Sequence, residues 1–255
     1  MKTTRPLLRF PRVLPALAAL LLVVTATVSA QVVTVSTSTS APTDNLLISF
    51  SESINAGIAW RADSRDEVTS ENWRDVGQLF TAPQDATLDA ITVVTSSGVN
   101  SPARGVSFTL TLYSFGTSFS TANAEVIQTF TGSTPSGTIS SGTFLAFDLP
   151  DVQLTAGITY GFLLHFDAMI DNRSIPLRLN NSSNAFAEGR LLTRVNSYDT
   201  DGQLVSLGSL STNTSSLEFY VQATPIPEPA TVAALFGLAV LALGLWRHRA
   251  RSPRS

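Results

Sequence analysis

The clearest hydrophobic pattern in the chain is an alternation with a period of two. Between residues 106 and 112, apolar residues alternate with serine and threonine. Successive side chains of a strand point to opposite faces, so this segment predicts a strand with Phe108 toward a core and Thr109 toward solvent. Short apolar or β-branched runs predict further strands at Leu88–Val93, Val126–Phe130, Thr143–Leu149, Ile158–Phe166, Ile175–Leu179, Arg190–Val195 and Leu217–Ala223.

Turn-forming residues separate these runs at regular intervals. Clusters of Gly, Pro, Asn and Ser lie at 96–105, 131–142, 167–174, 180–184 and 199–202. No segment between Gln31 and Ala223 has a sustained helical period. Many short strands divided by turns predict an all-β fold, an antiparallel β-sandwich or a jelly-roll-like domain.

Two local phrases support that fold class. The segment Phe80–Val93 resembles the opening strands of carbohydrate-binding-type jelly rolls, and Val152–Phe162 resembles a late strand–turn–strand of the same folds. Gly157 would supply the turn of the second phrase. Since any antiparallel sandwich needs such turns, the resemblance supports the fold more than it supports sugar binding.

The N-terminus has the pattern of a secretory signal peptide. A basic region up to Arg12 precedes the apolar stretch Val13–Val24, and small residues end at Ala30. Cleavage after Ala30 would leave Gln31 as the first residue. The alternative is an uncleaved membrane helix, which the twelve-residue length of the stretch and its Pro15 disfavour. No paired arginines precede the apolar region, which favours the general export route.

The C-terminal residues predict one transmembrane helix. Ala230–Trp246 contains no charged residue and would form a helix of about 25 Å, close to the ~30 Å of a hydrocarbon core. Four arginines in the tail 247–255 follow it, and basic flanks stay cytoplasmic. The residues that precede the helix are therefore expected outside the membrane.

The same tail resembles the bacterial PEP-CTERM sorting signal. Pro227-Glu228-Pro229, the apolar span and the arginine cluster follow one another in the order of that signal. The resemblance covers residues 225–255 and implies export, a membrane anchor and an exosortase as partner. This membrane protease would recognise Pro227, Glu228 and Pro229 and cut near them. An ordinary anchor with an incidental tripeptide is the alternative.

These features divide the chain into six parts. We expect a signal peptide at 1–30, a flexible leader at 31–45 with an edge strand as its alternative, and a β-sandwich ectodomain at 46–223. A proline-rich stalk at 224–229 leads to the helix at 230–246 and the basic tail at 247–255.

Without its two ends, the body of the chain is strongly acidic. Residues 31–223 hold eight arginines, no lysine and eighteen acidic residues, a net charge of about −10. Nucleic acid is therefore excluded as a partner, because phosphate backbones require clustered positive charge. The chain has no cysteine, so burial alone must stabilise the domain.

Residues suited to catalysis are few. His165 is the body's sole histidine, next to Asp167 in an apolar run that indicates a half-buried strand position. The absence of cysteine excludes thiol nucleophiles. The acidic stretch from Asp63 to Asp75 is interleaved with arginines and indicates a solvated loop with local ion pairs. A glycosidase needs two carboxylates at a suitable separation, which sequence does not reveal.

The sequence contains candidate residues for two binding chemistries. Asp199 and Asp201 precede Gly202 and are calcium candidates, although a plain Asp-Gly hairpin turn is the favoured interpretation. Trp60 and Trp73 are candidates for glycan stacking if their rings are exposed, and core residues otherwise. No cofactor and no resident metal are expected.

The sequence thus predicts a non-enzymatic exported envelope protein of a Gram-negative-type bacterium. It would be held in the inner membrane by its C-terminal helix and then passed to the cell surface or to an exopolysaccharide matrix, where exopolysaccharide is a candidate partner. A lectin-like carbohydrate-binding module is the alternative, and a surface glycosidase is a weaker one.

Overall fold

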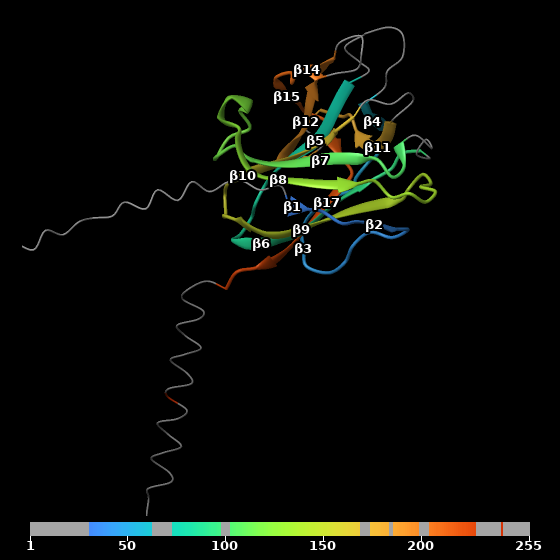
Figure 1. Ribbon diagram of the computed structural model, residues 1–255. Coiled ribbons are helices and arrows are strands. Elements are labelled where there is room, and N and C mark those ends of the chain that lie inside the picture. Colours follow the sequence, from blue (N-terminus) through green and yellow to red (C-terminus); the bar gives the residue numbers. More distant parts are fainter. Residues whose placement is uncertain are drawn as a thin grey trace, which may run out of the picture.

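The computed structural model is an all-β domain built of two sheets packed face to face (Figure 1). It describes residues 31–62, 73–97, 103–168, 174–183, 186–198, 204–227 and Leu241. Within these residues no helix has the length and apolar character that a membrane span requires. The expected signal peptide 1–30 lies outside them, as does the expected span 230–246 except for Leu241.

The smaller sheet has five strands, all paired antiparallel. Its order is β2 (Val35–Ser38), β9 (Phe144–Leu154), β6 (Ala86–Val94), β17 (Phe219–Pro225) and β3 (Leu46–Phe50). In the pairing with β17, Ala90 lies opposite Gln222 and Leu88 opposite Ala223, which leaves Asp89 as the extra residue of a β-bulge. The last strand of the domain, β17, lies between β6 and β3.

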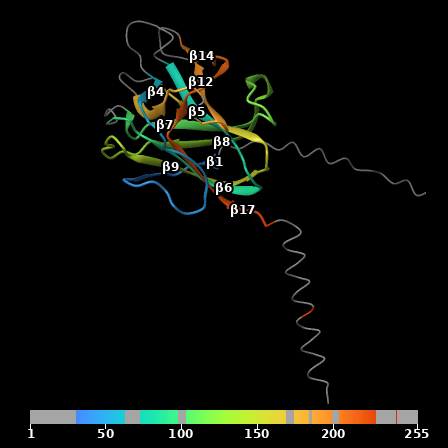
Figure 2. The same cartoon turned by 180° about the vertical axis from the view of Figure 1, so that it is seen from behind.

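The larger sheet has ten strands and a branch at β5. Figures 1 and 2 show it from opposite sides. Its main path is β1 (Gln31–Val32), β8 (Glu125–Ser133), β7 (Ser107–Ser114), β10 (Thr159–Phe166), β5 (Trp73–Thr81), β4 (Ala56–Ala62), β11 (Ser174–Asn180) and β16 (Ser216–Leu217). In the branch, β12 (Gly189–Val195) pairs with β5, and β15 (Leu210–Asn213) pairs with β12. A separate hairpin joins β13 (Ser197–Tyr198) and β14 (Leu204–Ser206), and η2 (Thr121–Asn123) is a short 3-10 turn.

The core between the sheets is rich in aromatic residues. Phe108 contacts Phe147 across the two layers in an edge-to-face arrangement, with ring centroids 5.4 Å apart. Phe108 is fully buried and Thr109 is only partly buried, so the period-two prediction is confirmed. Each segment predicted as a strand overlaps a strand of the structure, but Leu217–Ala223 is divided between β16 of the large sheet and β17 of the small sheet. Gly157 has the left-handed φ of 76° expected of its turn.

The expectation of a flexible leader at residues 31–45 is wrong for its first part, because residues 31–38 contain two paired strands. Gln31 and Val32 pair in parallel with β8, and Val35–Ser38 pair with β9, so the segment adds an edge strand to each sheet. The reason lies in Val33, which is buried and rests against Gly132, where any Cβ would lie 2.7 Å from a Val33 methyl. The edge-strand alternative is therefore the correct interpretation.

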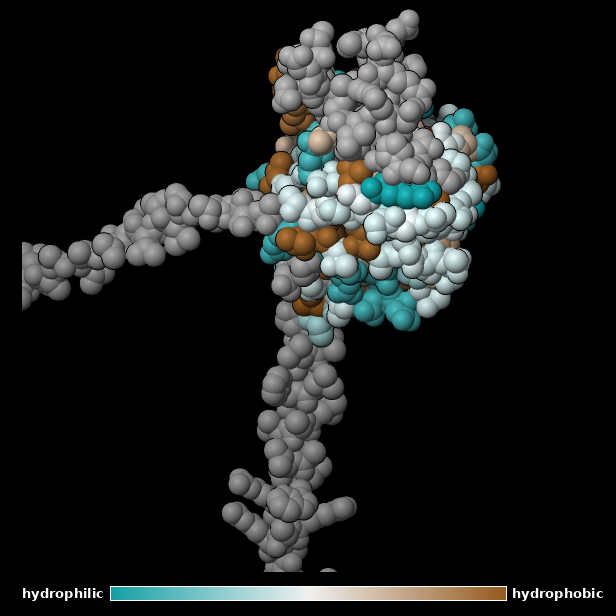
Figure 3. All heavy atoms as spheres, turned by 45° about the vertical axis from the view of Figure 1, so that its right-hand side comes forward, coloured by the Kyte–Doolittle hydropathy of each residue, from teal (hydrophilic) through white to brown (hydrophobic). Residues whose placement is uncertain are grey.

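A second, smaller apolar cluster lies on the outer face of the large sheet. It contains Leu79, Tyr113, Phe115, Leu163 and Leu192, and residues of the β7–β8 connection and β15 pack against it. On the face of the molecule that Figure 3 shows, hydrophobic residues form only small separate patches among hydrophilic and neutral ones. Scattered apolar residues of this kind are normal on a protein surface.

Candidate functional site

The first candidate site is the end of β17, where the chain leaves the folded domain. Pairing with β6 continues to Pro225, opposite Ala86. One residue later, the backbone N–H of Ile226 donates to the carbonyl of Asp85 at 3.0 Å. Pro225 and Pro227 have no N–H, so Ile226 is the only backbone donor among these three residues. Pro227 is exposed, and the folded ladder thus ends directly before it.

Three polar side chains fasten this strand end, and we call them the β17 clamp: Asn45, Asp89 and Thr224. The Thr224 hydroxyl donates to a carboxylate oxygen of Asp89 at 2.9 Å. The Asn45 amide donates to the same carboxylate oxygen and to the Thr224 hydroxyl, at 3.3 Å each. Asn45 has a left-handed φ of 51°, and its carbonyl accepts the N–H of Ala223 at 2.8 Å. The β-bulge in the β6–β17 pairing places Asp89 where it reaches both partners.

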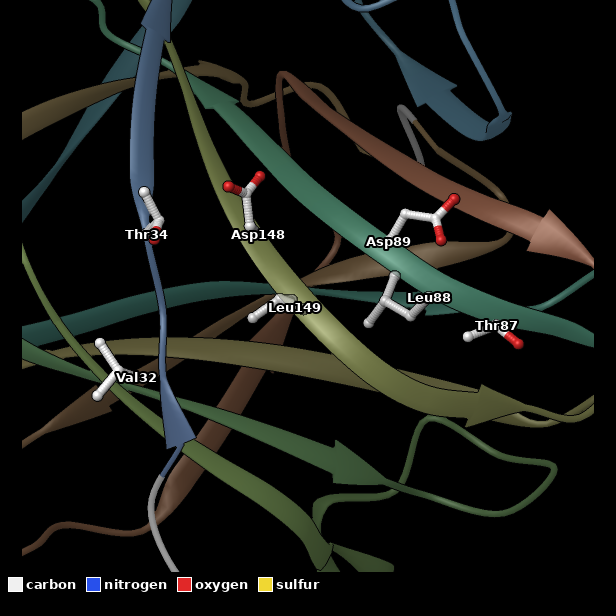
Figure 4. Close-up of a pocket in the computed structure, with 7 residues that line it drawn as sticks. All are labelled: Val32, Thr34, Thr87, Leu88, Asp89, Asp148 and Leu149. Carbon is white, nitrogen blue, oxygen red and sulfur yellow. The ribbon is translucent and has the colours of Figure 1, made fainter.

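A surface groove of about 360 Å³ adjoins the clamp (Figure 4). It lies between residues 32–34 and strands β6 and β9, with Leu88 and Leu149 as its apolar floor. The carboxylates of Asp89 and Asp148 project on the same side of the sheet. Carboxylates and threonine hydroxyls could bind the hydroxyl groups of a glycan. The Asp89 carboxylate, however, already accepts the hydrogen bonds of the clamp.

The second candidate site is a buried polar cluster on the outer face of the large sheet. Strand pairing places Asp75 of β5 opposite Arg194 of β12, and His165 of β10 follows the residue that pairs with Val76. Arg194 donates to one oxygen of Asp75 at 2.7 Å, and Asn196 donates to that oxygen at 3.0 Å. His165 Nδ1 lies 2.9 Å from the other oxygen.

This cluster corrects the interpretation of Asp75 as part of a solvated acidic loop. Asp75 is only 1% exposed and lies within β5. A buried carboxylate requires compensating charge and hydrogen bonds, and Arg194, Asn196 and His165 supply them. The sequence signal was obscured because Asp75 follows a run of charged residues, whereas the partners that neutralise it lie 90 to 121 residues later.

His165 and Asp75 have the arrangement of the histidine and the carboxylate of a hydrolytic triad. A carboxylate bonded to Nδ1 is the arrangement that orients a general-base histidine. The hydroxyl opposite His165 in the strand register is that of Thr109. It donates to Asp167 at 2.5 Å, so this hydroxyl is already committed to another acceptor. The contact between Asp75 and His165 therefore links strands β5 and β10.

Tyr113 lies near the same cluster. Burial raises the pKa of its hydroxyl above 10.0; the charge of Arg194 opposes this effect and that of Asp75 reinforces it. The neutral phenol is thus the stable form in the folded domain.

Trp60 is not a glycan-stacking platform. Its ring is fully buried and stacks on Phe166, with centroids 4.0 Å apart and planes 7° from parallel. It also packs edge-to-face on Phe108, which makes it a core residue and corrects the stacking candidate. Trp73 begins β5, and its side chain is outside the described part of the structure.

Several other sequence-predicted residues lie outside the described residues. These are Ala30 of the cleavage site, Glu228 and Pro229 of the tripeptide, and the calcium candidates Asp199 and Asp201. The last two belong to the connection between β13 and β14. Gln31 is the first residue of β1, and Pro227 directly follows Ile226, whose N–H is bonded to Asp85 of the domain.

The clamp residues were not foreseen. Asn45, Asp89 and Thr224 are separated by 44 and 135 residues along the chain and belong to no local motif. Only the pairing of β17 with both β3 and β6 brings them together.

Comparison with known families identifies the tail. The family model of the PEP-CTERM protein-sorting motif matches residues 225–250, which confirms the resemblance seen in the sequence. No curated protein matches the chain. The chain therefore carries a PEP-CTERM signal, which implies export, a C-terminal membrane anchor and processing by an exosortase. The matched segment begins at Pro225, the last residue of β17.

Proposed function

We propose that this protein is a non-enzymatic component of the cell surface or of the exopolysaccharide matrix, delivered there by its PEP-CTERM signal. The observation that carries the proposal is the position of the signal. The last strand of the described β-sandwich ends at Pro225 and the sorting segment starts at the same residue, so this domain is joined directly to a sorting tail.

The polar side chains of the domain also support a non-enzymatic role. Asp75 is held by Arg194, Asn196 and His165 in a buried cluster, and Asp89 is held by Asn45 and Thr224. A catalytic acid or base must reach the proton that it transfers, and groups whose hydrogen bonds are used within the fold are not free to do so. The net charge of about −10 for residues 31–223 suits a soluble domain in a hydrated extracellular layer.

Sorting is tested with the tripeptide. In a host that has an exosortase, the wild-type chain should appear outside the inner membrane without residues 230–255. A Glu228→Ala chain should remain full-length and membrane-bound. Intact mass of the protein in each fraction measures both results, and equal processing of the two chains would make the tripeptide incidental.

The absence of catalysis is tested with the purified domain 31–225. It should release no reducing sugar from polysaccharides of the host envelope. Turnover that disappears in Asp148→Asn or Asp89→Asn would establish a glycosidase acting through the groove of Figure 4 and would overturn the proposal.

A carbohydrate-binding module is the second candidate, and the groove beside Asp148 is the feature that favours it. Its apolar floor and hydroxyl-bearing rim suit the faces and edges of a sugar ring. Glycan-array binding that is lost in Asp148→Ala, with the unfolding midpoint unchanged, would promote this function. A single site of this kind would bind weakly and gain from many copies at a surface.

A further inference from the structure

The sorting tripeptide is too close to the folded domain to be bound independently of it. Ile226 is hydrogen-bonded to Asp85, and Glu228 lies two residues further on. Two fully extended residues span at most about 7 Å. A single helix of a protease is about 10–12 Å wide with its side chains. An enzyme that surrounds the tripeptide would therefore collide with the end of the small sheet.

The strand end that precedes the tripeptide is weakly attached. Thr224, Pro225, Ile226 and Pro227 are all exposed. Beyond Thr224 the two prolines donate no hydrogen bonds, so Ile226, which bonds to Asp85, is the one backbone donor among residues 225–227. Segments with few buried contacts and few backbone bonds open at low free-energy cost while the rest of the domain stays folded.

The β17 clamp is the principal side-chain attachment of this end. The Thr224 hydroxyl is held by Asp89, and Asn45 bonds to both of them. Upstream of the clamp, Phe219 and Val221 are buried in the main core, so detachment would stop at about Ala223.

We propose that the last residues of β17, Thr224–Ile226, detach from β6 before the sorting protease can act, and that the β17 clamp sets how readily they do so. The inference rests on processing at the PEP-CTERM signal. It makes Asn45, Asp89 and Thr224 positioning residues of the substrate, because they act on the tripeptide through the strand and do not contact the protease. The open end of the strand presents an extended backbone with free hydrogen-bonding groups, the form in which peptides are bound by β-augmentation.

The test uses a disulfide that prevents detachment. Thr87 and Thr224 are directly opposite in the β6–β17 ladder, and opposed residues have the Cα separation that a disulfide requires. The chain has no other cysteine, so Thr87→Cys/Thr224→Cys can form only this bridge within one molecule. Ser107→Cys/Ser133→Cys, an exposed opposed pair on β7 and β8, is the matched control.

Full-length chains are expressed in a host with an exosortase, and the processed fraction is followed over time. Bridge formation is checked by mobility with and without reductant. The Thr87/Thr224 bridge should slow processing by about tenfold or more relative to the control bridge, because it removes the detached state. Inserting Gly-Ser-Gly-Ser between Ile226 and Pro227 of the bridged chain should restore processing, since the tripeptide then lies clear of the domain.

Processing of the bridged chain at the rate of the control would overturn the proposal and would mean that the protease acts with the ladder closed. If the bridged chain fails to fold, the same spacer in the wild-type chain decides. It should accelerate processing, and an unchanged rate would refute detachment. Processing that is unaffected by Glu228→Ala would instead refute sorting at the tripeptide, so the two failures are distinguishable.

Discussion

At the scale of single residues, Asp75 is the charge on which the outer face of the large sheet depends. Asp75→Ala would leave the guanidinium of Arg194, only 11% exposed, without its carboxylate. We expect the free energy of unfolding to fall by about 3–5 kcal/mol, as when one partner of a buried ion pair is removed. Urea unfolding followed by circular dichroism measures it.

The matched control for that substitution is Asp148→Ala, an exposed carboxylate in the groove. It should change the stability by less than about 0.5 kcal/mol. Similar losses for the two variants would show that the buried cluster of Asp75 does not stabilise the fold. The milder Asp75→Asn keeps the measurement possible if the alanine variant does not fold.

Tyr113 gives the stability a dependence on alkaline pH. Because burial raises its pKa in the folded state, the unfolded chain loses this proton first as the pH rises above about 10. The unfolded state then binds fewer protons, so the free energy of unfolding falls as the pH increases from about 10 through the raised native pKa. In Tyr113→Phe this part of the decrease should be absent. Urea unfolding at several pH values between 8 and 11 tests it, and equal slopes would contradict it.

The role of a residue could be predicted from the sequence only where it depends on neighbouring residues in the chain. The alternation around Phe108 fixed its face because a strand has a period of two. The roles of Asp75 and Trp60 were not predictable, since each is decided by strands that lie far away in the chain. Trp60 is buried because β4 carries it over Phe166 of β10, a contact that no local pattern encodes.

At the scale of elements, strand β7 allows a direct test of which side chains point into the core and which point to solvent. Phe108→Asp places a charge in the core between the sheets and should unfold the domain. Its outward neighbour Thr109 contacts the Asp167 carboxylate, so the suitable control is Thr109→Asn, which keeps a donor for that contact. The control should cost less than about 1 kcal/mol. Far-ultraviolet circular dichroism of both variants gives the result, and a folded Phe108→Asp domain would contradict the assigned face.

The docking of the N-terminal segment is a second test at this scale. Gly132→Ala would place a Cβ 2.7 Å from a Val33 methyl and 2.9 Å from the Phe108 ring. We expect a loss of about 1–3 kcal/mol from overpacking. Val33→Ala should restore part of it, and a double-mutant cycle should give a coupling of about 0.5–3 kcal/mol. A coupling near zero would mean that residues 31–34 do not rest on β8.

Short edge strands are the elements that the sequence predicted least well. Residues 31–38 have a Ser/Thr/Val composition that is equally typical of a mobile leader. Their pairing depends on the absence of a side chain at Gly132, which leaves room for Val33. Strands such as β7 and β10 were predictable because each buries a complete face, whereas an edge strand of two to four residues has too short a pattern to be recognised. The long strand β5 was not among the predicted strands, since it begins directly after a run of charged residues.

At the scale of the whole molecule, the short link between domain and membrane fixes which end faces the lipid. Three residues lie between Ile226 and Ala230, where the sequence-predicted span begins, and the four steps from one to the other reach at most about 14 Å. Antiparallel pairing brings the β5–β6 turn, with Gln84, to the end of the domain where β17 terminates. The β8–β9 connection, with Ser136, lies at the opposite end of the strands.

The absence of cysteine allows this orientation to be measured with single thiols. Gln84→Cys and Ser136→Cys are both at exposed positions. In the anchored Glu228→Ala chain, a bulky thiol reagent should label position 84 several times more slowly than position 136, because the membrane crowds the first and not the second. In the released domain the two rates should converge, since both turns are then open to solvent. Equal rates in the anchored chain would mean that the domain stands clear of the bilayer. In that case residues 224–229 would form a free stalk, and the ladder seen at Pro225 and Ile226 would not persist at the membrane.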